Sequence, residues 1–160
     1  MVPCSTMLPA PLTDVEGLYV HVPFCRTRCS YCAFYITTRH ADLVDRYLAA
    51  IEREAASYGR IRPATVYFGG GTPTQLSAPA LNRLCAAVRG MIGDAAAREW
   101  TIEANPATLD DARLEVLRAH GVNRVSIGAQ FFDDAVLKRL GRTHHARWRG
   151  HTAPAWLENS

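Results

Sequence analysis

Three cysteines stand within eight residues of one another, directly after the apolar segment 17–22: Cys25, Cys29 and Cys32. Thiolates bind metals, so a cluster this tight indicates a ligand set rather than a disulfide framework. A cubane 4Fe-4S cluster held by three cysteines has one iron without a protein ligand. That iron is open to an exogenous molecule with its own chelating atoms.

A zinc site is the alternative interpretation of the same cysteines. His21 would join them as His-x3-Cys-x3-Cys-x2-Cys, which is an acceptable ligand spacing for zinc. Zinc leaves unexplained the glycine run 69–71, which follows an apolar segment and lets the backbone approach a ligand and expose its amides and carbonyls. We therefore favour the cluster and expect His21 to be a supporting or core residue.

The elements that must position these residues alternate between short strands and amphipathic helices, which is the pattern of an α/β protein with a parallel sheet. Strands are expected near residues 17–22, 64–69, 100–105 and 124–129. Helical spacing runs from Val44 to Tyr58, and a second helix begins after the N-cap Ser77 and buries Cys85. Further helix signals are a capping box at Thr108 and Asp111, and left-handed caps at Gly121 and Gly141.

Each expected strand has one apolar and one mixed face, because alternate residues point to opposite sides of a sheet. The apolar set, which helices would cover, is Leu18, Val20, Val22, Val66, Phe68, Trp100, Ile102, Val125 and Ile127. The mixed set is Tyr19, His21, Thr65, Tyr67, Thr101, Glu103, Asn105, Arg124, Ser126, Gly128 and Gln130. Hydrogen-bonding groups on one face of every strand predict that this face lines a cavity, as in a curved, partly open barrel.

Four segments resemble one protein family. They are LYVHVPFC at 18–25, VYFGGGTPT at 66–74, EANP at 103–106 and GVNRVSIGAQ at 121–130. With the cysteine spacing, they resemble the radical S-adenosylmethionine (SAM) superfamily, in the branch of oxygen-independent coproporphyrinogen III oxidases and HemW-type heme chaperones. The resemblance runs from about residue 17 to about residue 146.

The resemblance implies a partial (β/α)6 barrel similar to a TIM barrel, of which this chain carries the first four units, truncated, because about 130 residues cannot close a barrel. It implies that Cys25, Cys29 and Cys32 hold the 4Fe-4S cluster and that SAM binds the open iron, to be cleaved by one electron from the cluster. The SAM-binding positions it implies are Tyr19, Tyr31, Gly70, Gly71, Thr72, Glu103, Gln130 and Arg142.

Position 34 separates the two branches, because the coproporphyrinogen enzymes have a further cysteine there and this chain has Phe34. The resemblance therefore implies a HemW-like heme chaperone that binds heme and passes it to acceptor proteins, with an electron donor protein as a further partner and the heme site downstream. The alternatives are a coproporphyrinogen III oxidase and an inactive truncated fragment.

Composition limits the other possibilities. The 160 residues are 48% hydrophobic, enough for one core, and they contain no apolar run long enough to span a bilayer. The net charge of +3 and the lack of a groove-reading helix with the basic residues near the end argue against a nucleic-acid partner. Five cysteines, three of them clustered, favour reduced thiols in the cytoplasm.

Three regions are expected along the chain. Residues 1–16 are interrupted by prolines and lack a cationic start, so they are interpreted as a mobile leader rather than a secretory signal. Residues 17–146 form the N-terminal part of the radical SAM core. Residues 147–160 have neither helical nor strand periodicity and fall outside the family pattern.

Overall fold

A computed structural model of the protein describes residues 15–39, 43–93, 97–142 and 144–146. The expected tail 147–160 lies outside the described residues, as does nearly all of the expected leader. None of the helices in the described ranges is both long and apolar enough to cross a membrane.

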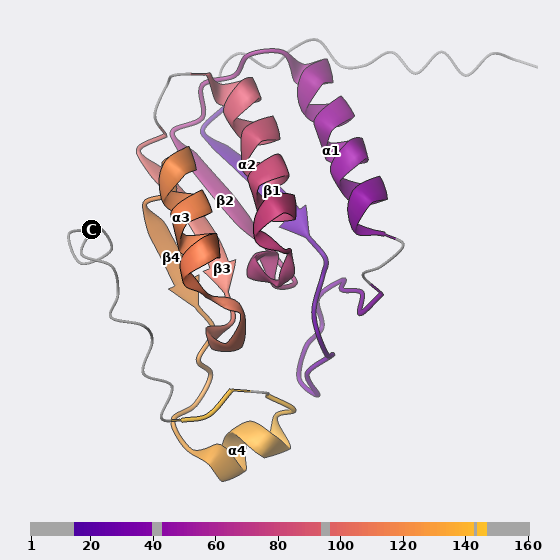
Figure 1. Ribbon diagram of the computed structural model, residues 1–160, viewed down its shortest axis with the longest axis vertical. Helices are drawn as coiled ribbons and strands as arrows, with labels where there is room; N and C mark the ends of the chain where they lie inside the picture. The colour runs from indigo at the N-terminus through magenta and orange to yellow at the C-terminus, as the bar shows by residue number, and fades with distance from the viewer. Residues whose placement is uncertain (1–14, 40–42, 94–96, 143, 147–160) are drawn as a thin grey trace, which may run out of the picture.

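Four strands form one parallel sheet in the order of the chain (Figure 1). They are β1 (Gly17–Val22), β2 (Thr65–Gly70), β3 (Glu99–Ala104) and β4 (Arg124–Ile127). The register pairs Val20 with Phe68, Phe68 with Ile102, and Ile102 with Val125. The predicted α/β class and its four strands are confirmed, and the strand bounds differ from the expected ones by two residues at most.

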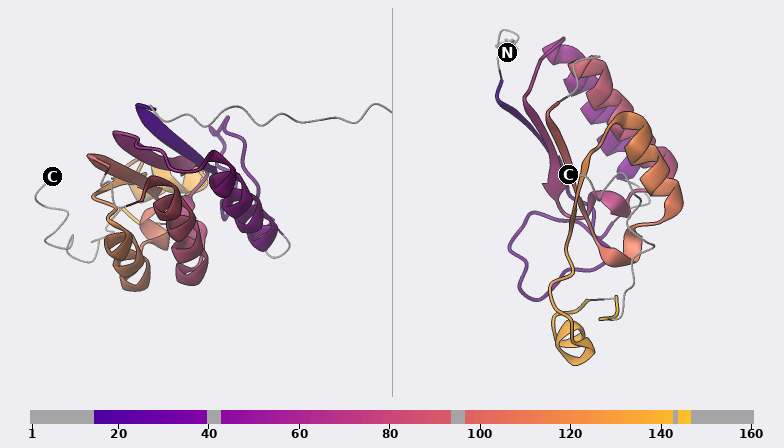
Figure 2. Two further views of the ribbon diagram at one scale, coloured as in Figure 1. Left: turned by 90° about the horizontal axis from the view of Figure 1, so that it is seen from above. Right: turned by 90° about the vertical axis from the view of Figure 1, so that its left-hand side faces the viewer.

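Three helices cover one face of this sheet (Figure 2): α1 (Val44–Tyr58), α2 (Ala78–Ile92) and α3 (Asp111–His120). A short fourth helix, α4 (Asp134–Arg139), lies beyond the carboxyl ends of the strands. Two turns of 3-10 helix, η1 (Pro73–Gln75) and η2 (Pro106–Thr108), follow β2 and β3. Each strand therefore leads into a connection at the same end of the sheet, which is where parallel α/β folds place their sites.

The core lies between the sheet and the three helices, as the alternation of apolar residues predicts. The rings of Phe68 and Trp100 pack edge to face, with centroids 5.5 Å apart. Cys85 is fully buried on α2, which confirms it as a core residue. The buried side chains of this layer include Val20, Val22, Val66, Phe68, Trp100, Ile102, Leu81, Leu84 and Val88.

The helix starts were partly predicted. Ser77 caps α2 as expected, because its hydroxyl accepts a hydrogen bond from the amide of Ala80. The capping box expected at Thr108 is wrong: the N-cap of α3 is Asp110, whose carboxylate accepts from the amide of Arg113. Thr108 belongs to η2 instead, which ends before α3 begins.

The other face of the sheet carries polar and aromatic side chains and is covered by no described helix (Figure 2). One residue from each strand contributes to a row across this face, in which each is paired with the next: Tyr19, Tyr67, Thr101 and Arg124. The expectation that Ile127 lies under the helices is wrong, because its side chain, at the end of the edge strand, is 39% exposed.

Candidate functional site

A cavity of about 410 Å³ opens at the carboxyl ends of the strands. It is lined by the loop that follows β1, by the ends of the other three strands and by the segment after α4. All the predicted site residues except Tyr19 line it, namely Cys25, Cys29, Cys32, Tyr31, Gly70, Gly71, Thr72, Glu103, Gln130 and Arg142. The fold thus brings residues from four separate connections to one place.

The cysteine loop, residues 23–37, is closed by its own backbone. The amide of Cys25 donates to the carbonyl of Thr37 (3.0 Å), and the amide of Thr37 donates to the carbonyl of Pro23 (2.8 Å). Within the loop, the guanidinium of Arg28 donates to the carbonyls of Ile36 (3.2 Å) and Cys32 (3.5 Å). These bonds hold the loop over the end of the sheet.

The three cysteines of this loop line the cavity, and each of them is partly exposed. The sulfur of Cys25 lies 3.6 Å from the hydroxyl of Thr72. Burial raises the pKa of the Cys25 thiol, and the hydrogen bond with Thr72 opposes this shift. A metal centre is needed to keep such a thiol deprotonated near neutral pH, because thiolates rather than thiols are metal ligands.

The glycine run is required by contacts inside the protein. Gly70 has φ of +105°, and a Cβ there would stand 2.4 Å from the ring of His21. A Cβ on Gly71 would stand 2.7 Å from the carbonyl carbon of Pro23, at the start of the cysteine loop. The missing side chains therefore let the cysteine loop and the end of β2 pack against each other.

The amides of this run are also taken up by the protein. The amide of Gly70 donates to Glu103 (3.1 Å), and the amides of Gly71 and Thr72 donate to carbonyls just before the cysteines, both at 2.8 Å. The expectation that the run exposes its amides to a ligand is wrong for Gly70 and Gly71. Thr72, the residue after the run, places its hydroxyl at the cavity wall beside Cys25.

Glu103 is the last residue but one of β3, and both of its carboxylate oxygens accept hydrogen bonds. The hydroxyl of Tyr67 donates to one of them over 2.7 Å, and the amide of Gly70 donates to the other. The carboxylate thereby stands at the cavity wall in a fixed orientation, with lone pairs left for a ligand.

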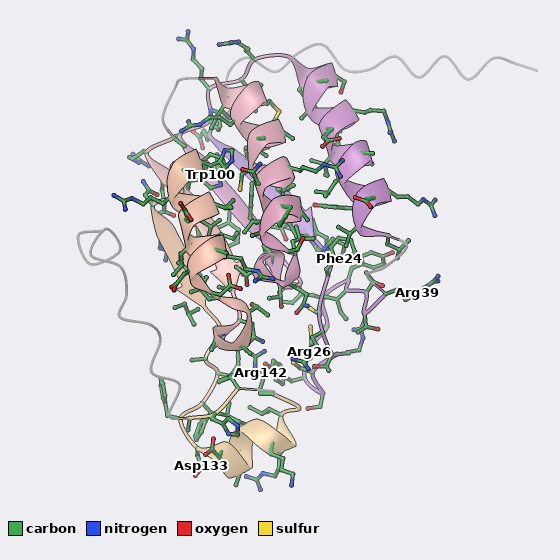
Figure 3. The ribbon with its side chains drawn as sticks, in the orientation of Figure 1. Phe24, Arg26, Arg39, Trp100, Asp133 and Arg142 are labelled. Atoms are coloured by element: carbon green, nitrogen blue, oxygen red, sulfur yellow. The ribbon has the colours of Figure 1, made fainter. Side chains whose placement is uncertain are left out.

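Arg142 reaches the cavity from the segment after α4 (Figure 3). Its guanidinium donates to the sulfur of Cys29 (3.7 Å) and to the carbonyl of Gly128. Its Nε is buried and has no hydrogen-bond partner within the described residues. A guanidinium that lines the cavity beside the cysteines is suited to an anionic ligand group such as a carboxylate.

Gln130 lies in the turn after β4 and has φ of +63°, a left-handed backbone that is uncommon outside glycine. His144 holds this turn, because its Nε2 bonds the carbonyl of Ala129 at 2.9 Å. Tyr31 lines the opposite wall, and burial raises the pKa of its hydroxyl, so it stays protonated near neutral pH.

Tyr19 does not reach the cavity. It lies on the open face of the sheet, where its hydroxyl and the Nδ1 of His21 are 3.0 Å apart. The Nε2 of His21 bonds the carbonyl of Tyr35, also at 3.0 Å. Both ring nitrogens of His21 are therefore engaged, which argues against the zinc site that would use His21 as a ligand.

The donor set of the cavity, three cysteines, fits a cluster that has one open iron. Among the described residues, no three His, Cys, Asp or Glu side chains are gathered closely enough to hold one metal ion. A cubane cluster instead takes a separate thiolate at each iron, so its ligands stand further apart. When bound, such a cluster supplies one-electron chemistry, and this chain supplies the thiols, the guanidinium of Arg142 and the carboxylate of Glu103 around it.

Sequence reasoning did not single out three residues that shape this site: Arg28 in the cysteine loop, Tyr67 against Glu103, and His144 at the turn after β4. Tyr67 could have been found from the sequence, because it lies on the mixed face of β2, which was expected to line a cavity. Arg28 and His144 carried none, since a single basic residue in a loop is ordinary.

Comparisons with known proteins agree with the geometry. The family model described as "Radical SAM superfamily" matches residues 19–152. The heme chaperones HemW of Lactococcus lactis and Escherichia coli are each 40% identical over 133 residues, which covers 83% and 80% of this chain and 35% of either relative.

Among solved structures, the radical SAM enzyme coproporphyrinogen III oxidase (HemN) of Escherichia coli matches with a TM-score of 0.75 at 33% identity, over 85% of this chain and 32% of that one. The chain thus spans about a third of the length of these relatives. The matched family model covers most of the chain, and the chain belongs to the radical SAM superfamily.

Proposed function

We propose that this protein is a HemW-like radical SAM protein that binds a 4Fe-4S cluster and SAM, and that it serves heme binding and transfer to acceptor proteins. The observation that carries the proposal is the shared cavity, which brings the three cysteines, Glu103 and Arg142 together. A cluster with an open iron needs those thiols, and a ligand with amino and carboxylate groups needs partners of both charges.

In this proposal Cys25, Cys29 and Cys32 hold the cluster, and Arg142 binds the carboxylate of SAM. Glu103 accepts hydrogen bonds from the ribose hydroxyls or the ammonium group of SAM. Tyr31, Gly70, Gly71, Thr72 and Gln130 complete the wall around it.

Tyr19 has a different place in the proposal. It stands behind Tyr67 on the open face and takes part indirectly, because its ring stacks on Tyr67 with centroids 6.1 Å apart.

The heme-related role rests on the relatives and on Phe34. Two relatives at 40% identity are named heme chaperones, and one at 38% is named an oxygen-independent coproporphyrinogen III oxidase, so the choice between the two roles rests on Phe34. Phe34 lines the cavity and is 65% exposed at the position where the coproporphyrinogen enzymes have a further cysteine. A phenylalanine cannot replace a thiolate, so we place the chain on the chaperone side. The electron donor protein, the heme acceptor and a cytoplasmic location belong to the same proposal.

A paired assay tests the role. A full-length version of the protein, reconstituted with its cluster, is titrated with heme by absorbance and assayed for decarboxylation of coproporphyrinogen III, with HemW of Lactococcus lactis and HemN of Escherichia coli as references. Saturable heme binding without decarboxylation supports the proposal. Decarboxylation at a rate near that of HemN contradicts it in favour of the oxidase, and absence of saturable heme binding in the full-length version contradicts the heme-binding role.

A further inference from the structure

The pair formed by Tyr67 and Glu103 lies at the edge of the cavity but is joined to the open face of the sheet. Tyr67 is on β2 and Glu103 is on the neighbouring strand β3. Phe68, which follows Tyr67, pairs with Ile102, which precedes Glu103. The Tyr67 hydroxyl donates to the Oε1 of Glu103 over 2.7 Å, which is a short bond to a charged acceptor. The bond therefore fixes the direction in which the carboxylate points.

The glycines next to this pair leave room for the ring and the carboxylate. Gly69 lies beside the pair, and a Cβ at that position would stand 2.7 Å from the Tyr67 ring and 3.0 Å from the Oε2 of Glu103. The amide of Gly70 donates to the same Oε2. The glycine run thus leaves room for the carboxylate and also clamps it from the second side.

The hydroxyl of Tyr67 is suited to donate a hydrogen bond to Glu103 at all times. Burial and the neighbouring Glu103 carboxylate raise the pKa of its hydroxyl to about 12, so the hydroxyl stays protonated at any physiological pH. The ring is braced by Tyr19, which stacks on it at an interplanar angle of 24°. Tyr19 is in turn bonded to His21. A ring held in this way presents its hydroxyl in one position.

We propose that Tyr67 is a positioning residue for SAM, which acts by holding the Glu103 carboxylate in the orientation that binds the cofactor. This inference rests on the proposed function and adds to it a residue that does not line the cavity. It also gives Tyr19 a role, because Tyr19 reaches the site only through the Tyr67 ring.

The test is a double-mutant cycle on the reconstituted chain, with SAM affinity read from the change that SAM causes in the EPR spectrum of the reduced protein. Tyr67→Phe removes only the hydroxyl, and Glu103→Gln keeps the shape of its partner. We expect Tyr67→Phe to weaken SAM binding about tenfold. In the Glu103→Gln background the same change is expected to have no further effect, because the two act as one unit.

Tyr47→Phe is the matched control. The hydroxyl of Tyr47 donates to the carbonyl of His21 over 2.8 Å, on the helix side of the sheet. Its loss removes a tyrosine hydrogen bond of similar length without touching Glu103, so SAM affinity is expected to stay unchanged while the melting temperature falls.

The possible results distinguish failure of this inference from failure of the proposed function. Unchanged SAM affinity in Tyr67→Phe, or effects that add in the double variant, overturns the inference while the proposed function stands. If the wild-type spectrum does not respond to SAM at all, the proposed function fails and the inference fails with it.

Discussion

The guanidinium of Arg142 lies 3.7 Å from the sulfur of Cys29, although 113 positions separate the two residues. The contact joins the last described connection of the chain to the first, across the mouth of the cavity. It places a fixed positive charge beside a cysteine that we assign to the cluster, and such a charge favours an anionic ligand bound next to it.

Arg142→Lys is predicted to weaken SAM binding about tenfold or more. Lysine keeps the charge but cannot hold a carboxylate through two parallel hydrogen bonds. Calorimetric titration of the reconstituted protein with SAM measures the change. Arg139→Lys, on the exposed side of α4, is the control and should bind like the wild type. Equal affinity in both variants would remove Arg142 from the SAM site.

Gly71→Ala is predicted to lower the free energy of unfolding by about 1–3 kcal/mol and to reduce the iron bound per chain. The new methyl group would meet the backbone at Pro23, which cannot move without shifting the cysteine loop. Gly90→Ala is the opposite control, because Gly90 sits exposed on α2 with open space around it. That variant should gain about 0.5–1 kcal/mol. Urea unfolding and iron analysis would contradict the account if Gly71→Ala behaved like Gly90→Ala.

Thiol reactivity separates structural from cluster cysteines. Burial raises the pKa of Cys85 to about 12, and its side chain is fully buried. Iodoacetamide applied to the cluster-free, folded protein is predicted to modify Cys25, Cys29 and Cys32 and to spare Cys85. Peptide mass spectrometry identifies the modified sites, and Cys85 should react once urea is added. Modification of Cys85 under native conditions would show that α2 does not pack as described.

Acid is predicted to destabilise the fold through two histidines. Burial lowers the pKa of His144 and of His120, and in His120 the nearby Arg89 adds to the effect. As the pH falls through the ordinary histidine value of about 6.5, the unfolded chain takes up protons that the folded chain refuses. The free energy of unfolding therefore declines below that pH and recovers above it.

The pH effect is measured by urea unfolding at several pH values between about 7.5 and 5. In His144→Asn the decline should be smaller than in the wild type, since one of the two groups is gone. An identical pH dependence in both proteins would show that His144 does not contribute.

Several residues show which parts of the fold can be predicted from the sequence. Val20, Phe68 and Ile102 alternate with polar neighbours, and that period predicted the sheet and its covered face. Cys85 was predicted to be buried from helical spacing alone. Local signals fail where two residues compete: Thr108 and Asp110 both suit an N-cap, and only the course of η2 decides for Asp110.

The candidate site depended more on resemblance than on pattern. The cysteine spacing indicates a ligand set by itself, but the bonds from Tyr67 to Glu103 and from Arg142 to Cys29 span 36 and 113 positions. No local period encodes such contacts, because they exist only once the strands are in register. The glycine run also misled in part, since the chain itself takes up its amides.

The central claim is that Cys25, Cys29 and Cys32 hold a cluster with an open iron to which SAM binds. The most direct test is anaerobic reconstitution with iron and sulfide, followed by EPR of the reduced sample with and without SAM, with Cys85→Ser and Cys29→Ser as matched variants. The account predicts about four irons and about four sulfides per chain in the wild type and Cys85→Ser, with a spectrum that changes on adding SAM, and loss of both in Cys29→Ser. A chain that binds zinc instead, or a spectrum that SAM leaves unchanged, would contradict it.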